Sequence, residues 1–311
     1  MELIKNPNFD FLGKAKYFVA LSLFFIVGGI AWMWTQGIHY GVEFSGGTQL
    51  ILQFQNPPEI DKIRDAVNKV DAGAVIQTYG DPKTNKVLVR VSGEVAETDL
   101  DATARRVREA VAQHYPANPV TESSSEIVGP VVGAELRQKA ILLTVLGLVF
   151  QLIYIAIRFK GGIWGIAASV AALHDVVVCL GFLAFLRFEI TLNVIAALLT
   201  LVGYSVNDTI VIFDRVRENL KQRRKDSLSK IINDSVNQTL TRTLISNGTT
   251  FLAVLGLFLF GGEVLRGFGF TMVVGILVGT YSTIYIAAPL VVWWHDFTQK
   301  SQKPPAARAA L

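Results

Sequence analysis

The sequence predicts an α-helical polytopic membrane protein with six transmembrane helices and one α+β domain between the first and the second helix. The composition favours a membrane protein, because 51% of the 311 residues are hydrophobic and only 17% are charged. A long polar stretch, residues 38–138, interrupts the apolar segments and carries strand and helix patterns of its own. We therefore expect a helical bundle in the bilayer and one small domain outside it.

Six apolar segments are long enough to cross a hydrocarbon core about 30 Å thick. They are residues 17–37, 139–158, 163–186, 190–213, 243–260 and 264–294. The first segment follows Lys5, Lys14 and Lys16 and has no small-x-small cleavage pattern after its apolar core. This pattern predicts a retained membrane anchor and not a removed signal peptide.

Basic residues predict the orientation, because Lys and Arg accumulate in cytoplasmic loops. Arg158 and Lys160 lie between the second and third segments, and a dense basic group occupies residues 215–230. The connections 187–189 and 261–263 carry little positive charge, which indicates the opposite side. Both termini are therefore expected in the cytoplasm. The predicted division is a cytoplasmic segment (1–16), helix 1 (17–37), an exterior α+β domain (38–138), helices 2 to 6 (139–297) with a cytoplasmic loop (214–242), and a disordered cytoplasmic tail (298–311).

The exterior domain alternates strand and helix patterns in the order β-α-β-β-α-β. Strands are predicted at 48–54, 74–79, 86–91 and 119–128, and helices at 60–70 and 98–114. Thr98 can cap the second helix, and the turn-rich string 80–85 suits a hairpin between the two central strands. The order predicts a ferredoxin-like fold.

Nothing in this domain indicates catalytic chemistry. His39 and His114 stand apart, and no paired carboxylates occur. The glycine-rich string 41–48 lacks the Gly-Lys-Ser/Thr ending of a phosphate-binding loop, so its glycines are expected to permit a tight turn. We therefore predict a contact domain or a moving domain.

Asp208 lies near the end of the fourth apolar segment, where an ionisable group costs about 2.5–3.5 kcal/mol to insert at mid-membrane. Such a residue is a functional-site candidate by default. The alternative is that water at the membrane face relieves its charge, because the chain becomes frankly charged at Asp214. Tyr204, Asp208 and Val211 share a helical face with Asn207 beside it, so these polar groups are predicted to point into a bundle.

Arg242 is the predicted partner of Asp208, because it opens the fifth segment and could reach a carboxylate about a turn deeper. A carboxylate that pairs with a guanidinium and separates from it could carry a proton. The alternative is that Arg242 only marks the orientation of its helix. His174 and Asp175 lie near mid-depth of the third segment and are either part of a proton path or structural hydrogen-bonding groups.

No cofactor or metal site is predicted, because Cys179 is the single cysteine and lies in an apolar stretch. No nucleic-acid partner is expected. Asp175 and Asp208 raise the alternative of an intramembrane aspartyl protease, but the Gly-x-Gly-Asp string of such enzymes is absent and the two residues lie at different depths. We expect a transport component and not an enzyme.

Several strings resemble the SecF family, the smaller subunits of the bacterial SecD–SecF complex, which is related to the resistance-nodulation-division transporters. They are GVEFSGGT (41–48), ALHDVVV (172–178), LNVIAALLTLVGYSVNDTIVIFDRVREN (192–219) and RTLISNGTTFLAVLGLFLFGG (242–262). The resemblance implies that the six helices form one half of a resistance-nodulation-division-type bundle. It implies functional importance in proton conduction for the Asn-Asp-Thr aspartate and the Arg-Thr-Leu arginine, which fall on Asp208 and Arg242. Glu43 stands where the family usually has an aspartate.

The resemblance also implies a function and partners. The function is to assist protein translocation across the bacterial inner membrane, driven by the proton-motive force. The implied partners are a SecD-like subunit, a SecYEG-type translocon, YajC/YidC-type accessory proteins, exported unfolded polypeptides and the lipid membrane. Two alternatives stay open: a purely structural subunit of the translocon, and half of a proton-driven small-molecule or lipid exporter.

Overall fold

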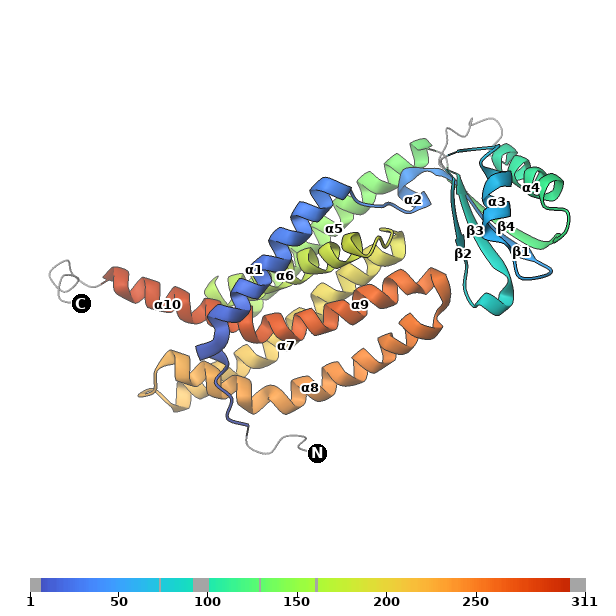
Figure 1. Cartoon of the computed structure of the whole chain (residues 1–311). Coiled ribbons are helices and arrows are strands. Elements are labelled where there is room, and N and C mark those ends of the chain that lie inside the picture. Colours follow the sequence, from blue (N-terminus) through green and yellow to red (C-terminus); the bar gives the residue numbers. More distant parts are fainter. Residues whose placement is uncertain (1–6, 73, 92–100, 129, 160–161, 303–311) are drawn as a thin grey trace.

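The computed structural model describes residues 7–72, 74–91, 101–128, 130–159 and 162–302. It consists of a bundle of long helices with a small sheet domain at one end (Figure 1). The long helices are α1 (Phe11–Gln36), α5 (Pro130–Phe159), α6 (Gly162–Phe185), α7 (Leu192–Gln222), α8 (Leu228–Phe260) and α9 (Gly262–Ser282), which continues through a π-helix (Thr283–Ala287) into α10 (Ala288–Gln302). The described chain thus has six helical segments long and apolar enough to span a membrane, as predicted.

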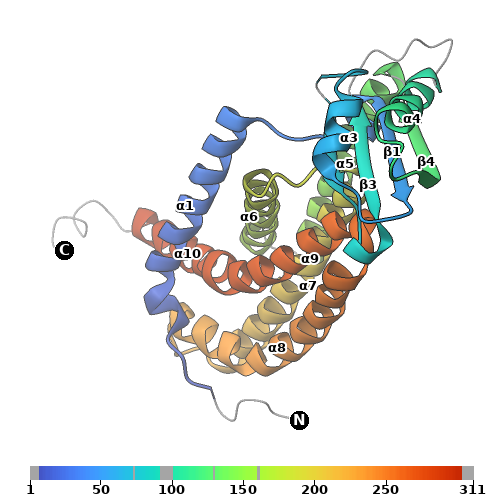
Figure 2. The ribbon, with the colours of Figure 1, turned by 45° about the vertical axis from the view of Figure 1, so that its right-hand side comes forward.

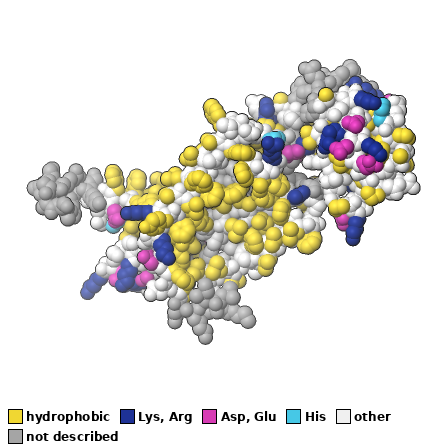
Figure 3. All heavy atoms as spheres, viewed as in Figure 1, with side chains coloured by type: hydrophobic (Ala, Val, Ile, Leu, Met, Phe, Trp, Pro, Cys, Tyr) yellow, Lys and Arg dark blue, Asp and Glu magenta, His cyan; other side chains and the backbone are white. Residues whose placement is uncertain are grey.

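Helix α6 lies at the centre of the bundle and contacts α1, α5, α7 and α9 (Figure 2). About half of the residues in the apolar stretches of α6 and α7 are buried inside the chain, compared with 6% in α1 and α5. A band of hydrophobic side chains therefore covers the outer helices, and charged side chains gather at the two ends of the bundle (Figure 3). This distribution is the one expected of helices that face hydrocarbon.

The sheet domain confirms the predicted β-α-β-β-α-β order. Its elements are β1 (Gly47–Phe54), α3 (Ile60–Val67), β2 (Val75–Thr78), β3 (Lys86–Val91), α4 (Ala102–His114) and β4 (Val120–Val128). The sheet order is β2-β3-β1-β4 with every pair antiparallel, which is the ferredoxin-like arrangement. Alternation of side chains along β1 places Leu50, Leu52 and Phe54 against Val107 and other residues of α3 and α4.

A short helix and a tight turn connect β2 to β3. Gly80 has a positive φ of 74°, the 3₁₀ turn Pro82–Thr84 follows, and Asn85 adopts the left-handed conformation with φ 53°. The predicted hairpin at 80–85 is confirmed. The predicted cap Thr98 lies outside the described residues, and α4 begins after Asp101, whose side chain makes no capping hydrogen bond.

Several helices extend beyond the predicted spans. Helix α5 begins at Pro130, not at residue 139, and α7 and α8 extend to residues 222 and 228, so the predicted loop 214–242 shrinks to residues 223–227. The extensions of α7 and α8 form because apolar residues at helical spacing pack together between these two helices, namely Val216, Leu220, Ile231, Ile232, Val236 and Leu240. The disordered tail predicted at 298–311 is likewise wrong for residues 298–302, which continue α10.

The turn between α7 and α8 is held by charge pairs. The Arg223 Nη2 atom lies 2.7 Å from the Oδ2 atom of Asp226 and 2.7 Å from the Oδ2 atom of Asp234. The hydrogen bond from Arg223 lowers the pKa of Asp226 from its ordinary value. Ser227 then caps α8 by accepting a hydrogen bond from the Lys230 amide. A short turn, residues 223–227, thus replaces the predicted loop 214–242 and is held by these ion pairs and by the helix cap.

Candidate functional site

Asp208 lies on the inner face of α7, where α7, α8 and α9 meet. It is 5% exposed, and its carboxylate accepts a short hydrogen bond from the Asn247 side-chain amide of α8. The same Nδ2 atom donates to the Thr280 hydroxyl of α9 at 2.6 Å. One carboxylate, one amide and one hydroxyl therefore join three membrane-spanning helices. Asp208 is buried within the fold of this chain, so the fold does not expose it to water at the membrane face.

Arg242 does not form the direct ion pair predicted from the sequence. It is close enough for its charge to act on Asp208, but its side chain is exposed and makes no hydrogen bond within the described part of the chain. Arg242 precedes Asn247 by five residues, a separation that turns about 140° around an α-helix. Asn247 therefore points at Asp208, while Arg242 points to the neighbouring face of α8.

The predicted grouping of polar residues on α7 is only partly formed. Asn207 is exposed on the outer surface, about 100° around the helix from Asp208. The Tyr204 hydroxyl donates to the Ser246 carbonyl of α8 at 3.2 Å, at the edge of the same surface. Asn207 and Asp208 thus face different surroundings although they are adjacent in sequence.

His174 and Asp175 form a second polar cluster, at the centre of the bundle. Asp175 is fully buried and lies 2.9 Å from the His174 ring through Oδ1. Its other oxygen, Oδ2, accepts hydrogen bonds from Ser205 of α7 at 2.5 Å and from Ser282 of α9 at 2.9 Å. Three partners therefore fix this carboxylate between α6, α7 and α9.

Two residues that sequence reasoning missed extend this cluster to α1. The His174 Nε2 atom lies 2.9 Å from the Ser22 hydroxyl, which lies 2.9 Å from the Tyr281 hydroxyl. Tyr281 in turn donates to the Phe18 carbonyl of α1. The chain of contacts runs from α6 through α1 to the end of α9.

Four consecutive residues, Thr280–Thr283, connect the two clusters. Thr280 bonds to α8, Tyr281 to α1, Ser282 to α6, and Thr283 to Thr209 of α7 at 3.0 Å. The π-helix begins at the last of them. π-Helical turns are rare and frequently lie at functional sites. Four hydroxyl side chains in a row within an apolar segment are the signal in the sequence that could have found this site.

Glycines of α9 let these helices approach closely. A Cβ atom at Gly279 would lie 3.1 Å from the Ser205 Cβ and 3.5 Å from the Asp175 carboxylate. A Cβ atom at Gly275 would lie 2.5 Å from the Leu201 side chain. The glycine spacing 275–279 therefore permits close approach of α9 to α6 and α7.

The glycine-rich string 41–48 forms the junction between the sheet domain and the bundle. Gly46 and Gly47 have positive φ values of 71° and 128° after a short helix, α2 (Val42–Ser45), which the sequence did not predict. A Cβ atom at Gly133 would lie 2.9 Å from the Gly46 nitrogen, so α5 passes directly against this turn. The predicted role of the glycines in a tight turn is confirmed.

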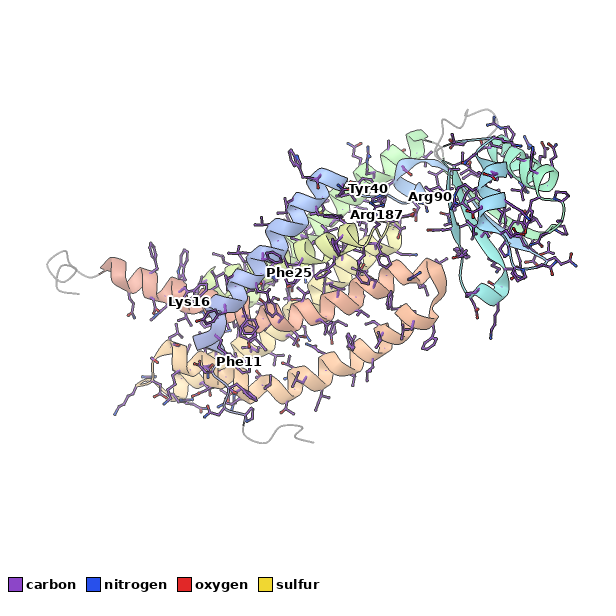
Figure 4. All side chains as sticks on the ribbon, viewed as in Figure 1. Phe11, Lys16, Phe25, Tyr40, Arg90 and Arg187 are labelled. Carbon is purple, nitrogen blue, oxygen red and sulfur yellow. The ribbon has the colours of Figure 1, made fainter. Side chains whose placement is uncertain are left out.

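The junction also joins the domain to the α6–α7 connection. Ile190 exchanges backbone hydrogen bonds with the carbonyl of His39 at 2.8 Å and the amide of Gly41 at 2.9 Å. Arg90 of β3 pairs with Glu189 of the same connection. Figure 4 places Arg90 in the sheet domain opposite Arg187, which follows α6 at this end of the bundle.

No group of three or more His, Cys, Asp or Glu side chains within the described ranges is arranged to hold a metal ion. Cys179 is buried among apolar residues of α6, α7 and α9. The geometry offers two buried carboxylates, each hydrogen-bonded to hydroxyl, amide or imidazole side chains, and carboxylates of this kind can bind and release protons.

Residues 107–297 match the family described as "Protein export membrane protein SecD/SecF, C-terminal", and residues 31–58 match its "SecD/SecF GG Motif". The chain belongs to the SecD/SecF family. Among its SecF relatives is the protein translocase subunit SecF of Calditerrivibrio nitroreducens, 44% identical, with 94% of this chain and 96% of the relative aligned. That of Pseudomonas aeruginosa is 38% identical over 98% and 97% of the two chains.

A crystal structure of SecDF from Thermus thermophilus, a translocon-associated membrane protein, superposes with a TM-score of 0.82 at 36% identity. The match covers 94% of this SecD/SecF family chain and 39% of the SecDF chain, so the chain corresponds to well under half of that protein. The super-membrane-facing form of SecDF matches with a TM-score of 0.71. The family and these relatives identify the chain as an auxiliary subunit of Sec protein translocation.

Proposed function

We propose that this chain works with a SecD-like partner and uses the proton-motive force to promote protein export across the bacterial cytoplasmic membrane. The observation that carries the proposal is the buried Asp208 carboxylate at the contact of α7, α8 and α9, with the charge of Arg242 beside it. Proton binding and release at Asp208 would change its contacts with Asn247 and Arg242. Helices α7, α8 and α9 then shift relative to one another.

The energy available is sufficient for such a shift. One charge crossing about 150–200 mV supplies about 4 kcal/mol, which biases a two-state element by about a thousandfold. Helix α7 begins two residues after Ile190, which is bonded to the linker of the sheet domain. Movement of α7 is therefore transmitted to the exterior domain, which we propose acts on the exported polypeptide.

The position of the partner follows from polar side chains on the outer surface of α7 and α8. Asn207, Arg242, Ser246 and Thr249 are all exposed on helices that span the membrane. Such groups are costly against lipid. We propose that the SecD-like half covers this surface and completes the path around Asp208 and Arg242. In this proposal Asp175 and His174 of α6 hold the helices beside this path, through the hydrogen bonds that Asp175 accepts from Ser205 of α7 and Ser282 of α9.

The orientation follows from charge. The exposed cations Arg224 and Lys225 lie in the α7–α8 turn and Lys221 lies at the end of α7 beside it. This turn is at the same end of the bundle as the start of α1 and the end of α10 (Figure 1). We therefore propose that both termini are cytoplasmic and that the sheet domain is exterior. Association with a SecYEG-type translocon and YajC/YidC-type proteins belongs to this proposal through the SecF relatives, and no enzymatic activity is part of it.

Protein export into membrane vesicles that contain this chain and its SecD-like partner tests the proposal. We expect Asp208→Asn to abolish the stimulation of export by the proton-motive force. The exposed residue Asp65 on α3 provides the control, and Asp65→Asn should export normally. Undiminished stimulation with Asp208→Asn would indicate a purely structural subunit.

A further inference from the structure

We propose that Asn247 is a positioning residue that holds Asp208 in both of its protonation states, and that Thr280 fixes the orientation of Asn247. This inference rests on the proposed function, in which Asp208 carries the proton. Asn247 is 5% exposed and donates from one nitrogen to both Asp208 and Thr280. It is the residue that connects Asp208 to the third helix, α9.

The hydrogen bonds determine which end of the Asn247 amide faces Asp208. The Thr280 hydroxyl donates to the Ile276 carbonyl at 2.8 Å, so its proton is already used. The group 2.6 Å from its oxygen must therefore be a donor, which is the NH₂ end of Asn247. Thr280 thus holds that end of the amide toward the Asp208 carboxylate, where an ionised acid requires a donor.

The other end of the amide suits the protonated acid. The Asn247 Oδ1 atom is buried and has no hydrogen-bond partner within the described part of the chain. A carboxylic acid that has taken up a proton becomes a donor and needs an acceptor. Asn247 supplies a donor for one protonation state and an unused acceptor for the other, which neither leucine nor aspartate at this position could do. The Thr243 hydroxyl, one turn away on α8, is likewise buried and has no hydrogen-bond partner among the described residues.

Few other charged groups face Asp208. Arg242 of α8 is the charged residue in electrostatic contact with it. His174 and Asp175 of α6 and Tyr281 of α9 are bonded in the separate cluster around Ser22 and Ser205. Arg158 of α5 pairs with Asp214, nearly two turns further along α7. A change at Asn247 is therefore expected to act on Asp208 without displacing another charge.

The test is proton flux as a function of pH in proteoliposomes that contain the full chain and its SecD-like partner. Asn247→Leu and Thr280→Val are expected to move the pH midpoint of flux upward by about one to two units, because the charge-assisted hydrogen bond to the ionised carboxylate is stronger than the bond to the neutral acid, so its loss raises the energy of the ionised form more. Thr280→Ser keeps the hydroxyl and should restore the wild-type midpoint. Thr271→Val is the control, since Thr271 also lies on α9, is fully buried where Thr280 is partly buried, and bonds to the Gly267 carbonyl of its own helix.

A purely structural role would lower thermal stability and leave the midpoint unchanged in both Asn247→Leu and Thr280→Val, and that result would overturn the inference. If Asn247→Leu does not assemble, the smaller change Thr280→Val decides alone. Asp208→Asn separates this failure from that of the proposed function. Full flux with Asp208→Asn would show that Asp208 does not carry the proton. Lost flux with Asp208→Asn, together with an unchanged pH midpoint in Asn247→Leu and Thr280→Val, would contradict only the role of Asn247.

Discussion

The two buried aspartates of the bundle are held in different ways. Asp175 has three side-chain partners, His174, Ser205 and Ser282, on three helices. Among the residues that the structure describes, Asp208 has one such partner, Asn247, on the side of α7 nearer the exposed polar surface. A carboxylate with many fixed partners is suited to holding helices together, and one with a single adaptable partner is suited to changing its protonation state.

This difference predicts different costs of substitution. Asp175→Leu is expected to lower the free energy of unfolding by about 1–3 kcal/mol per lost partner, because the buried hydroxyls of Ser205 and Ser282 would lose their acceptor. Asp208→Leu is expected to cost less, because fewer side chains bond to Asp208. Thermal unfolding of the purified chain in detergent compares the two variants, and equal losses of stability would contradict this assignment of roles.

Sequence reasoning reached the two aspartates because an ionisable residue in an apolar segment is conspicuous. It could not reach Ser22 or Asn247, because a single serine or asparagine in a helix is commonplace and its partner lies 152 or 39 residues away in the chain. It paired Arg242 with Asp208 from depth alone. The depth of a residue in the membrane does not determine which way its side chain faces around the helix axis. Around α8, Asn247 and not Arg242 faces Asp208.

At the scale of elements, α1 and α6 meet through backbone contact at two glycines. A Cβ atom at Gly29 would lie 3.0 Å from the Gly181 Cα, whereas a Cβ atom at the adjacent Gly28 would contact nothing within 4 Å. Gly29→Ala is therefore expected to destabilise the chain by about 1–3 kcal/mol through overpacking, and Gly28→Ala to be tolerated. Thermal unfolding distinguishes them. Equal stability of the two variants would show that the helices do not pack this closely.

The sheet domain is tied to the α6–α7 connection by one ion pair and a short backbone bridge. Arg90→Ala should loosen this connection, because Arg90 is 8% exposed and its partner Glu189 would lose its counter-charge. We expect hydrogen exchange at the Gly41 and Ile190 amides to increase about tenfold.

The control for this exchange experiment is Arg64→Ala. Arg64 pairs with Asp61 on the exposed surface of α3, away from the junction, and surface pairs contribute little. Unchanged exchange in Arg90→Ala would mean that the backbone bridge alone holds the domain.

The elements predicted best were those with strong periodic patterns. The strand 48–54 carries apolar residues at every second position (Leu50, Leu52 and Phe54), and the six spans are long and apolar, so sequence and structure agree. The helix α2 was missed because it is one turn long and follows glycine. The extended ends of α7 and α8 were missed because their charged outer faces conceal an apolar stripe, and the π-helix because nothing local requires it.

At the scale of the whole molecule, the chain is a helical bundle that exposes polar side chains on one membrane-facing surface. The exposed Asn207 and Arg242 lie on spanning helices whose other surfaces are apolar, and the chain corresponds to 39% of the SecDF protein it superposes on. A proton path that runs along this side requires a second half to seal it from lipid. We therefore expect the chain alone to conduct protons poorly, and the assembled pair to conduct them.

The most direct test of the central claim is proton flux across proteoliposomes that contain the chain with its SecD-like partner, driven by an imposed membrane potential. Flux is expected with wild type and with Asp65→Asn, and it should fall to the level of partner-free vesicles with Asp208→Asn. Wild-type flux through the Asp208→Asn pair would contradict the claim that Asp208 carries the proton.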